Sequence, residues 1–295
     1  MHPEQFAQHD SSARRFATLA ADDITARIID IEAAIGGAAD APTVVFLHGL
    51  TFNRGHWTPA IRALSDSEPG SQPIHRMIAF DLPGHGGSPA PDSYAMDDLA
   101  ATLHAALDDA GVTDPVVVGH SAGAVFATGY ALRYAVRGVV NVDQPLRASG
   151  FATLLQKNAE ILNGPQYLQV WNMLLGGMHI DLLAPDVRPL VTDAPMPARE
   201  LLLGYWSELM NTAPAELDEH WLRQLAVLRK NQVPYRHIAG AALEPAYEQW
   251  LRAALPEVEI TVLPGSGHFP HLADPAGTAA VVRAAVATAS GAPTA

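Results

Sequence analysis

The chain has 295 residues, no cysteine and a formal net charge of −13. The length fits one large domain, or a domain with a sizeable insertion. The missing cysteines exclude a disulfide scaffold, a cysteine-ligated metal or iron–sulfur site and a cysteine nucleophile.

The composition also bears on partners and location. A strongly negative charge argues against nucleic acid and anionic membrane surfaces, because phosphate groups are met by clustered Lys and Arg. No stretch approaches the ~18 consecutive apolar residues of a membrane span. The N-terminus lacks the apolar region of a secretory signal. We therefore expect a cytoplasmic protein that binds neither membrane nor nucleic acid; the oligomeric state stays open.

Strand and helix patterns alternate along most of the chain. Residues 15–19 and 24–31 alternate apolar with polar side chains and predict two antiparallel strands. Short apolar runs with the length of buried strands follow at 44–47, 77–80, 116–118, 139–142, 233–238 and 258–263. Helical patterns lie between and after them at 56–64, 96–110, 122–136, 246–254 and 274–287. This order predicts an α/β fold with a mostly parallel sheet and helices on both faces.

Residues 147–225 interrupt that alternation. They contain no convincing strand and are predicted to form several helices separated by Pro and Gly. The segment holds Trp171, Trp206 and Trp221, three of the five Trp of the chain. These side chains either pack a small helical core or form the apolar underside of a lid. We expect residues 1–146 and 226–295 to form the two parts of one core, and 147–225 to form a helical cap.

A strand that runs into Gly119-His120-Ser121-Ala122-Gly123 has the pattern G-x-S-x-G. Glycines at these positions allow a tight strand-to-helix turn, the nucleophile elbow, that lifts the Ser121 side chain above the edge of the sheet. The following helix begins beneath Ser121, so the Ala122 amide and the helix dipole face a developing oxyanion. The context predicts a serine nucleophile with Ala122 as an oxyanion donor.

A serine nucleophile needs a base and an orienting acid. His268 lies in a Gly-rich loop just past the last predicted strand, where open α/β sheets place their active sites. We predict His268 as the base and expect nearby His271 to be structural or at the rim. No third histidine or carboxylate is spaced to complete a metal site with this pair, so no metal is expected.

Two further loops follow predicted strands. A backbone N–H from the His48-Gly49-Leu50 loop, that of Leu50, is predicted as the second oxyanion donor. Residues 81–88, with the sequence DLPGHGGS, match neither a P-loop nor G-x-G-x-x-G. We expect them to form a structural loop that shapes the wall of the pocket.

Together, HGL after one strand, DLPGHGGS after the next, GHSAG and a late GSGHFPH resemble the α/β-hydrolase superfamily, in particular its members with a helical cap. The match covers roughly residues 15 to 290, in the order of the family. The resemblance implies an eight-stranded sheet, Ser121 as nucleophile, His268 as base and no cofactor. Leu50 and Ala122 take the positions of the oxyanion hole.

The triad acid departs from the usual pattern. The family commonly places an Asp after the strand that precedes the His-bearing strand, but here Glu244 is the first acid after 233–238. A second position used in the superfamily follows the strand after the nucleophile helix, and Asp143 stands there. A charge at the end of a buried strand is costly unless it is paired. We therefore favour Asp143 over Glu244.

These residues predict a serine esterase with a Ser121–His268–Asp143 catalytic triad that acts on a hydrophobic or aromatic small molecule. Lactone opening, cleavage of a C–C bond, and amide or peptide cleavage remain alternatives within the same fold. A slow-turnover ligand-binding receptor is the alternative outside enzymes. A dehalogenase or epoxide hydrolase of this fold would use Asp as nucleophile, and position 121 is Ser.

Overall fold

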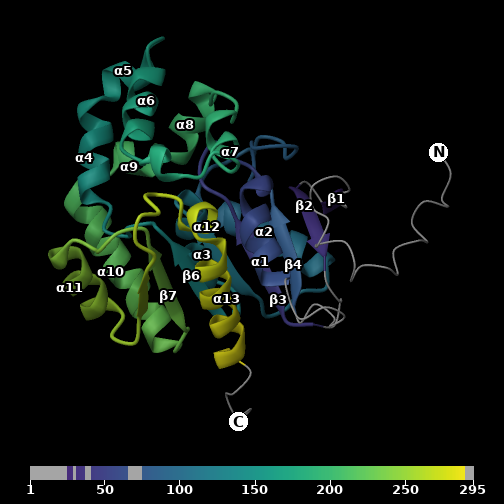
Figure 1. Ribbon diagram of the computed structural model, residues 1–295. Coiled ribbons are helices and arrows are strands. Elements are labelled where there is room, and N and C mark those ends of the chain that lie inside the picture. The colour runs from purple at the N-terminus through teal and green to yellow at the C-terminus, as the bar shows by residue number, and fades with distance from the viewer. Residues whose placement is uncertain (1–24, 29–30, 37–40, 66–74, 290–295) are drawn as a thin grey trace.

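The described residues form one eight-stranded sheet with the strand order β1-β2-β4-β3-β5-β6-β7-β8. The computed structural model describes residues 25–28, 31–36, 41–65 and 75–289 (Figure 1). The strands are β1 Thr25–Ile28, β2 Ile31–Gly36, β3 Thr43–Leu47, β4 Arg76–Phe80, β5 Val116–His120, β6 Gly138–Val142, β7 Tyr235–Ala239 and β8 Glu259–Val262. The predicted eight-stranded sheet is thus confirmed.

The sheet is mostly parallel. β1 pairs antiparallel with β2, and β2 antiparallel with β4, whereas the pairs from β4 through β8 are all parallel. Every residue of β3, β5 and β6 is buried, which explains why these strands are continuous apolar runs rather than alternating patterns. The predicted strand at 15–19 lies outside the described residues. The observed partner of β1 is β2, which the sequence pattern did not predict because the Ala and Gly residues of β2 give a weak strand signal.

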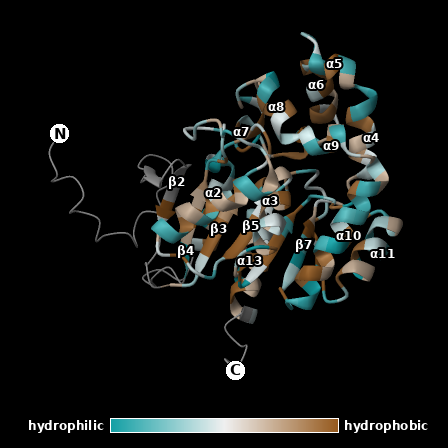
Figure 2. Ribbon diagram, turned by 180° about the vertical axis from the view of Figure 1, so that it is seen from behind, coloured by the Kyte–Doolittle hydropathy of each residue, from teal (hydrophilic) through white to brown (hydrophobic). Residues whose placement is uncertain are grey.

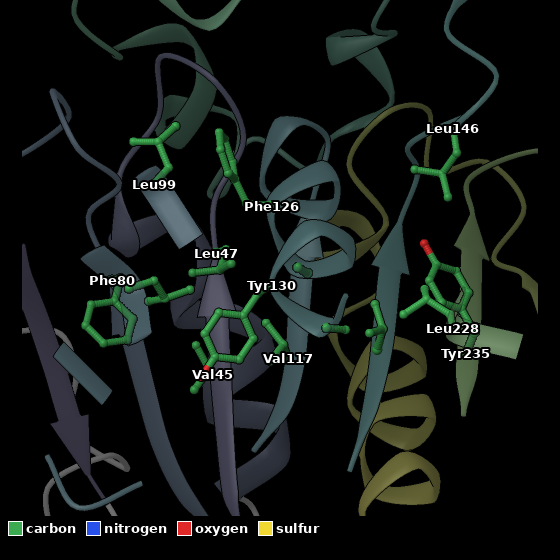
Figure 3. Packing of buried hydrophobic residues seen from close by; sticks show 14 of the residues in the cluster. Val45, Leu47, Phe80, Leu99, Val117, Phe126, Tyr130, Leu146, Leu228 and Tyr235 are labelled. Carbon is green, nitrogen blue, oxygen red and sulfur yellow. The ribbon is translucent and has the colours of Figure 1, made fainter. Parts of the chain in front are cut away.

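Helices cover both faces of the sheet. On one face α1 Thr58–Ser65 and α13 Pro275–Ala289 pack side by side, and α13 lies over β5, β6 and β7. On the other, α2 Met96–Asp109 and α3 Ala122–Ala131 lie with α10 Pro214–Lys230 and α11 Pro245–Ala254. Figure 3 shows part of the second layer, in which Phe126 and Tyr130 of α3 pack against the sheet.

Residues 147–225, all of them described, contain helices and no strand. The helices are α4 Ser149–Lys157, α5 Ala159–Asn163, α6 Leu168–Gly176, η5 Ile180–Leu182, α7 Pro189–Thr192, α8 Arg199–Tyr205, α9 Ser207–Asn211 and the first part of α10. Figure 1 shows α4 to α9 gathered at one end of the sheet. The division at 225/226 remains a prediction; it falls within α10, whose Leu225 and Leu228 join the core.

The helices at this end of the sheet have their own buried cluster. Trp171 and Trp206 are buried there, with ring centroids 6.4 Å apart. Figure 2 shows that the central strands are hydrophobic (brown), whereas α10 is largely hydrophilic (teal). Leu50, in the loop after β3, inserts its side chain into the Trp cluster. The cluster therefore joins the helices to a loop of the core.

Candidate active site

Ser121 stands on the turn between β5 and α3 in a strained backbone conformation, with φ +51° and ψ −125°. Its N–H donates to the carbonyl of Val142 across 3.1 Å, which ties the turn to β6. A Cβ on Gly119 would lie 2.1 Å from the carbonyl oxygen of Gly123, and one on Gly123 would lie 2.2 Å from that of Leu47. Only glycine fits at both positions, so the G-x-S-x-G pattern is required by the close approach of strand and helix.

Asp143 follows β6, also with a positive φ of +54°. One carboxylate oxygen, Oδ1, accepts the N–H of Gly240 at 2.9 Å. The other, Oδ2, lies 2.8 Å from Nδ1 of His268. The carboxylate is thus held from two sides, and the geometry fixes the Nδ1–H tautomer that leaves Nε2 of His268 as the basic atom.

Glu244, the alternative acid, has a different partner. Its two carboxylate oxygens accept the N–H groups of Ala246 and Tyr247 at 3.1 and 2.9 Å. These are the first turns of α11, so Glu244 caps that helix. The structure therefore brings Asp143, rather than Glu244, to His268.

The turn that carries Asp143 is fixed by a buried residue that sequence reasoning missed. Nδ2 of Asn141 donates to the carbonyl of Gln144 at 2.8 Å, and Oδ1 of Asn141 accepts the N–H of Gln144 at 3.0 Å. Asn141 Nδ2 also lies 3.1 Å from the hydroxyl of Tyr235. A buried Asn in an otherwise apolar strand was the available signal, since buried amides need hydrogen-bond partners.

His268 is anchored through its backbone. Its N–H donates to the carbonyl of Met178 at 3.1 Å, and its carbonyl accepts Nε2–H of His120 at 2.7 Å. Burial, with a smaller contribution from neighbouring His271, lowers the pKa of His120 well below its ordinary value. His120 thus remains a neutral donor that ties the His268 loop to the residue before Ser121.

His271 is not at the rim. It is fully buried in the short helix α12 Pro270–Ala273, with its ring 4.6 Å from that of Trp57 and 4.3 Å from that of His120. Burial lowers the pKa of His271 well below its ordinary value, and the nearby rings of His56 and His268 lower it further. His271 is therefore a neutral packing residue behind His268, which is the structural one of the two expected alternatives.

The two predicted oxyanion residues flank Ser121. Ala122 is the first residue of α3, so its N–H has no acceptor within the helix. Leu50 follows β3, and both residues line the cavity that Ser121 and His268 also line. The predicted site residues thus converge at the carboxyl ends of β3, β5, β6 and β8.

This cavity has a volume of about 1790 Å³ and lies between the core and the helices α4, α6, α8, α9 and α10. Its lining is mostly apolar and aromatic, with Phe151, Trp171 and Trp206 among the residues from those helices. Residues 81–88 are not part of the lining, so this loop lies one layer behind the wall. Such a cavity suits an apolar ligand larger than most single-ring compounds.

In the described part of the chain, no group of three His, Asp or Glu side chains is arranged to hold a metal ion. Among the same residues, no helix is both long and apolar enough to cross a membrane.

Comparison with known proteins agrees with the architecture. Residues 44–281 match the alpha/beta hydrolase family. The chain belongs to this family. It is therefore a member of a family of hydrolases, as the sequence motifs suggested.

Individual relatives are distant. The chain is 27% identical to a 2-succinyl-6-hydroxy-2,4-cyclohexadiene-1-carboxylate synthase of Serratia proteamaculans over 84% of its length and 94% of that protein. It is 26% identical to a protein of Shigella flexneri named as a candidate carbamate hydrolase, over 80% of this chain and 88% of that one. Among solved structures, AqDC, described as cleaving the ring of the Pseudomonas quinolone signal, superposes with a TM-score of 0.71 at 18% identity, covering 90% of this chain and 99% of that one. The last similarity concerns the fold alone.

Proposed function

We propose that the protein is a serine hydrolase that cleaves a carboxylic ester of a hydrophobic or aromatic small molecule through an acyl-enzyme. The observation that carries the proposal is the 2.8 Å contact between Asp143 and His268 in a cavity that Ser121 also lines. A serine on a strained turn, with a histidine whose Nδ1 is occupied by a carboxylate, is the arrangement that general-base activation of a hydroxyl requires.

In the first half-reaction, Nε2 of His268 takes the proton of Ser121 as Oγ attacks the ester carbonyl carbon. The carbonyl π electrons move to oxygen, and the N–H groups of Leu50 and Ala122 stabilise the resulting oxyanion. Each such donor is worth roughly 3–4 kcal/mol of transition-state stabilisation in comparable sites. Asp143 stabilises the imidazolium that forms. Collapse of the tetrahedral species breaks the C–O bond, and His268 gives its proton to the departing alkoxide.

In the second half-reaction, a water molecule replaces the alcohol. His268 takes a proton from the water as its oxygen attacks the acyl carbon, and a second tetrahedral species forms on the same donors. Its collapse returns the proton to Ser121 and frees the carboxylic acid. No residue other than the triad has to change its protonation state.

The cavity supports the choice of substrate class. Trp171, Trp206 and Phe151 give it an apolar side, and its volume of about 1790 Å³ exceeds the ~300–1,000 Å³ of ordinary small-molecule pockets. Residues 147–225 act in this proposal as a cap that excludes water and selects apolar acyl or alcohol groups.

The test is a panel of p-nitrophenyl esters, aryl-fused lactones, β-diketones and anilides, run with the wild type and with Ser121→Ala. We expect turnover of apolar aryl esters by the wild type and loss of at least 10³-fold with Ser121→Ala. Preference for lactones or diketones would redirect the proposal to those bonds within the same triad. A stoichiometric burst of p-nitrophenol without steady-state turnover would indicate a slow-turnover ligand-binding receptor instead of an enzyme.

A further inference from the structure

The loops that follow β3 and β4 are joined by two buried histidines in a reciprocal arrangement. Nε2 of His48, in the first loop, accepts the N–H of Leu82 in the second at 2.9 Å. Nε2 of His85, in the second loop, accepts the N–H of Thr51 in the first at 2.9 Å. The two rings contact edge to face, with centroids 5.0 Å apart. Each loop therefore supplies an imidazole acceptor for a backbone donor of the other.

His85 also contacts the segment above the site. Its Nδ1–H donates to the carbonyl of Pro83 at 3.1 Å, and the same carbonyl accepts the hydroxyl of Tyr205, the last residue of α8, at 2.8 Å. The Tyr205 ring lies edge to face on His85, with centroids 5.2 Å apart. A continuous set of contacts thus runs from Tyr205 through Pro83 and His85 to Thr51.

Thr51 is the residue next to the oxyanion donor Leu50. It is buried and has a φ of +72°, a left-handed conformation that is costly for a β-branched residue unless neighbouring contacts impose it. The hydrogen bond from the Thr51 N–H to His85 fixes the peptide that joins residues 50 and 51. On its other side, the Leu50 side chain is buried in the cluster of Trp171 and Trp206.

We propose that His85 is a positioning residue, which holds the loop of Leu50 in the geometry of an oxyanion hole and couples that geometry to the docking of Tyr205. The inference deepens the proposed function and rests on it. His85 touches neither substrate nor the cavity; it acts through Thr51. The sequence predicted that the DLPGHGGS loop shapes the wall of the pocket. In this proposal the loop lies behind that wall and positions the oxyanion loop through His85.

Histidine suits the position because the two hydrogen bonds need an acceptor and a donor on opposite sides of one rigid ring. Only the neutral Nδ1–H form provides both. Burial lowers the pKa of His85, while hydrogen bonding to the carbonyls of Pro83 and Leu82 and, to a lesser extent, the charge of Asp81 oppose that shift. Besides Asp81, the titratable groups that face His85 are His48 and Tyr205.

The experiment compares His85→Leu, His85→Gln and Tyr205→Phe with the wild type. Leucine fills the space but offers no acceptor to Thr51, whereas the Gln side-chain oxygen is an acceptor at a similar distance from Cα. His104→Leu is the matched control, since His104 lies on α2 and stacks on Tyr134, 3.8 Å away, with no contact to the oxyanion loop. Each variant is assayed for kcat and KM on an aryl ester and for inhibition by 2,2,2-trifluoroacetophenone, whose hemiketal places an oxyanion in the hole.

We expect His85→Leu to lower kcat about 30-fold with KM changed less than threefold, and to weaken the trifluoromethyl ketone by a similar factor. This is below the 10²–10³-fold cost of deleting an oxyanion donor because the donor is displaced rather than lost. His85→Gln should recover to within about fivefold of the wild type. Tyr205→Phe should lower kcat about threefold, and its effect should disappear in the His85→Leu background if both act through one set of contacts.

Wild-type kcat and inhibitor affinity in folded His85→Leu would overturn the inference, as would an equal loss in His104→Leu. If His85→Leu does not fold, Tyr205→Phe decides: unchanged kcat and inhibitor affinity would contradict the coupling. Failure of the proposed function is a different result, in which Ser121→Ala keeps its turnover and the ketone does not inhibit the wild type.

Discussion

Replacing Asp143 by Asn tests the assignment of the triad acid. If the Asn oxygen stays on the Gly240 N–H, its NH₂ group faces Nδ1 of His268 and forces the proton onto Nε2, so the base can no longer accept a proton. If the Asn amide is flipped instead, its NH₂ group faces the N–H of Gly240, so two hydrogen-bond donors point at each other. Neither orientation supports a basic Nε2.

A wrong histidine tautomer lowers kcat about 10⁴-fold in comparable triads, which corresponds to roughly 5 kcal/mol in the activation barrier. The loss of stability should be only about 1 kcal/mol, because an Asn oxygen can still accept one of the two bonds. Steady-state hydrolysis of a p-nitrophenyl ester gives kcat, and urea unfolding gives the free energy of unfolding.

Glu244→Gln is the matched control. It weakens the cap of α11 by about 0.5–1 kcal/mol and should leave kcat within twofold of the wild type. Asp143→Asn with more than a tenth of wild-type kcat, or a collapse of kcat in Glu244→Gln, would contradict the assignment of Asp143 as the triad acid.

Two further predictions concern stability. Because Ser121 has a φ of +51°, the free energy of unfolding in urea should be about 1 kcal/mol higher for Ser121→Gly than for Ser121→Ala. Equal stability of the two variants would show that the turn is unstrained. Burial lowers the pKa of His56 and of His237 from 6.5 to about 4. At a pH below 6.5 these histidines therefore bind protons in the unfolded chain but not in the folded one, so the free energy of unfolding falls as the pH drops from about 6.5 towards 4. Each of these histidines should remove about 2 kcal/mol of the free energy of unfolding between pH 7 and pH 5, so that the loss should be about 2 kcal/mol smaller in His237→Gln than in the wild type; an equal loss in the two proteins would contradict it.

Much of the architecture was predictable because it rests on local patterns. The all-buried β3 and β5 are continuous apolar runs, and the parallel sheet follows from strands that alternate with helices. The turn that carries Ser121 is marked by glycines that the packing of β5 on α3 requires. β2 was missed because small residues dilute its alternation.

The supporting residues of the site were not predictable from spacing. His85 and Thr51 are 34 positions apart, and their contact depends on how two loops meet after parallel strands. With 13 histidines in the chain, sequence alone gives no reason to single out His85 or His120. The choice of Asp143 over Glu244 rested on the cost of an unpaired charge at a strand end, and the observed contact with His268 follows that reasoning.

The most direct test of the proposed function is to identify the residue that becomes acylated. The wild type is mixed with an aryl fluorophosphonate, which traps an activated serine, and the modified peptide is mapped by mass spectrometry. We expect one phosphonate per chain, on Ser121, with the rate of labelling reduced at least 10³-fold in both His268→Gln and Asp143→Asn. Labelling at another residue, or labelling of Ser121 at an unchanged rate in these variants, would contradict a Ser121–His268–Asp143 mechanism.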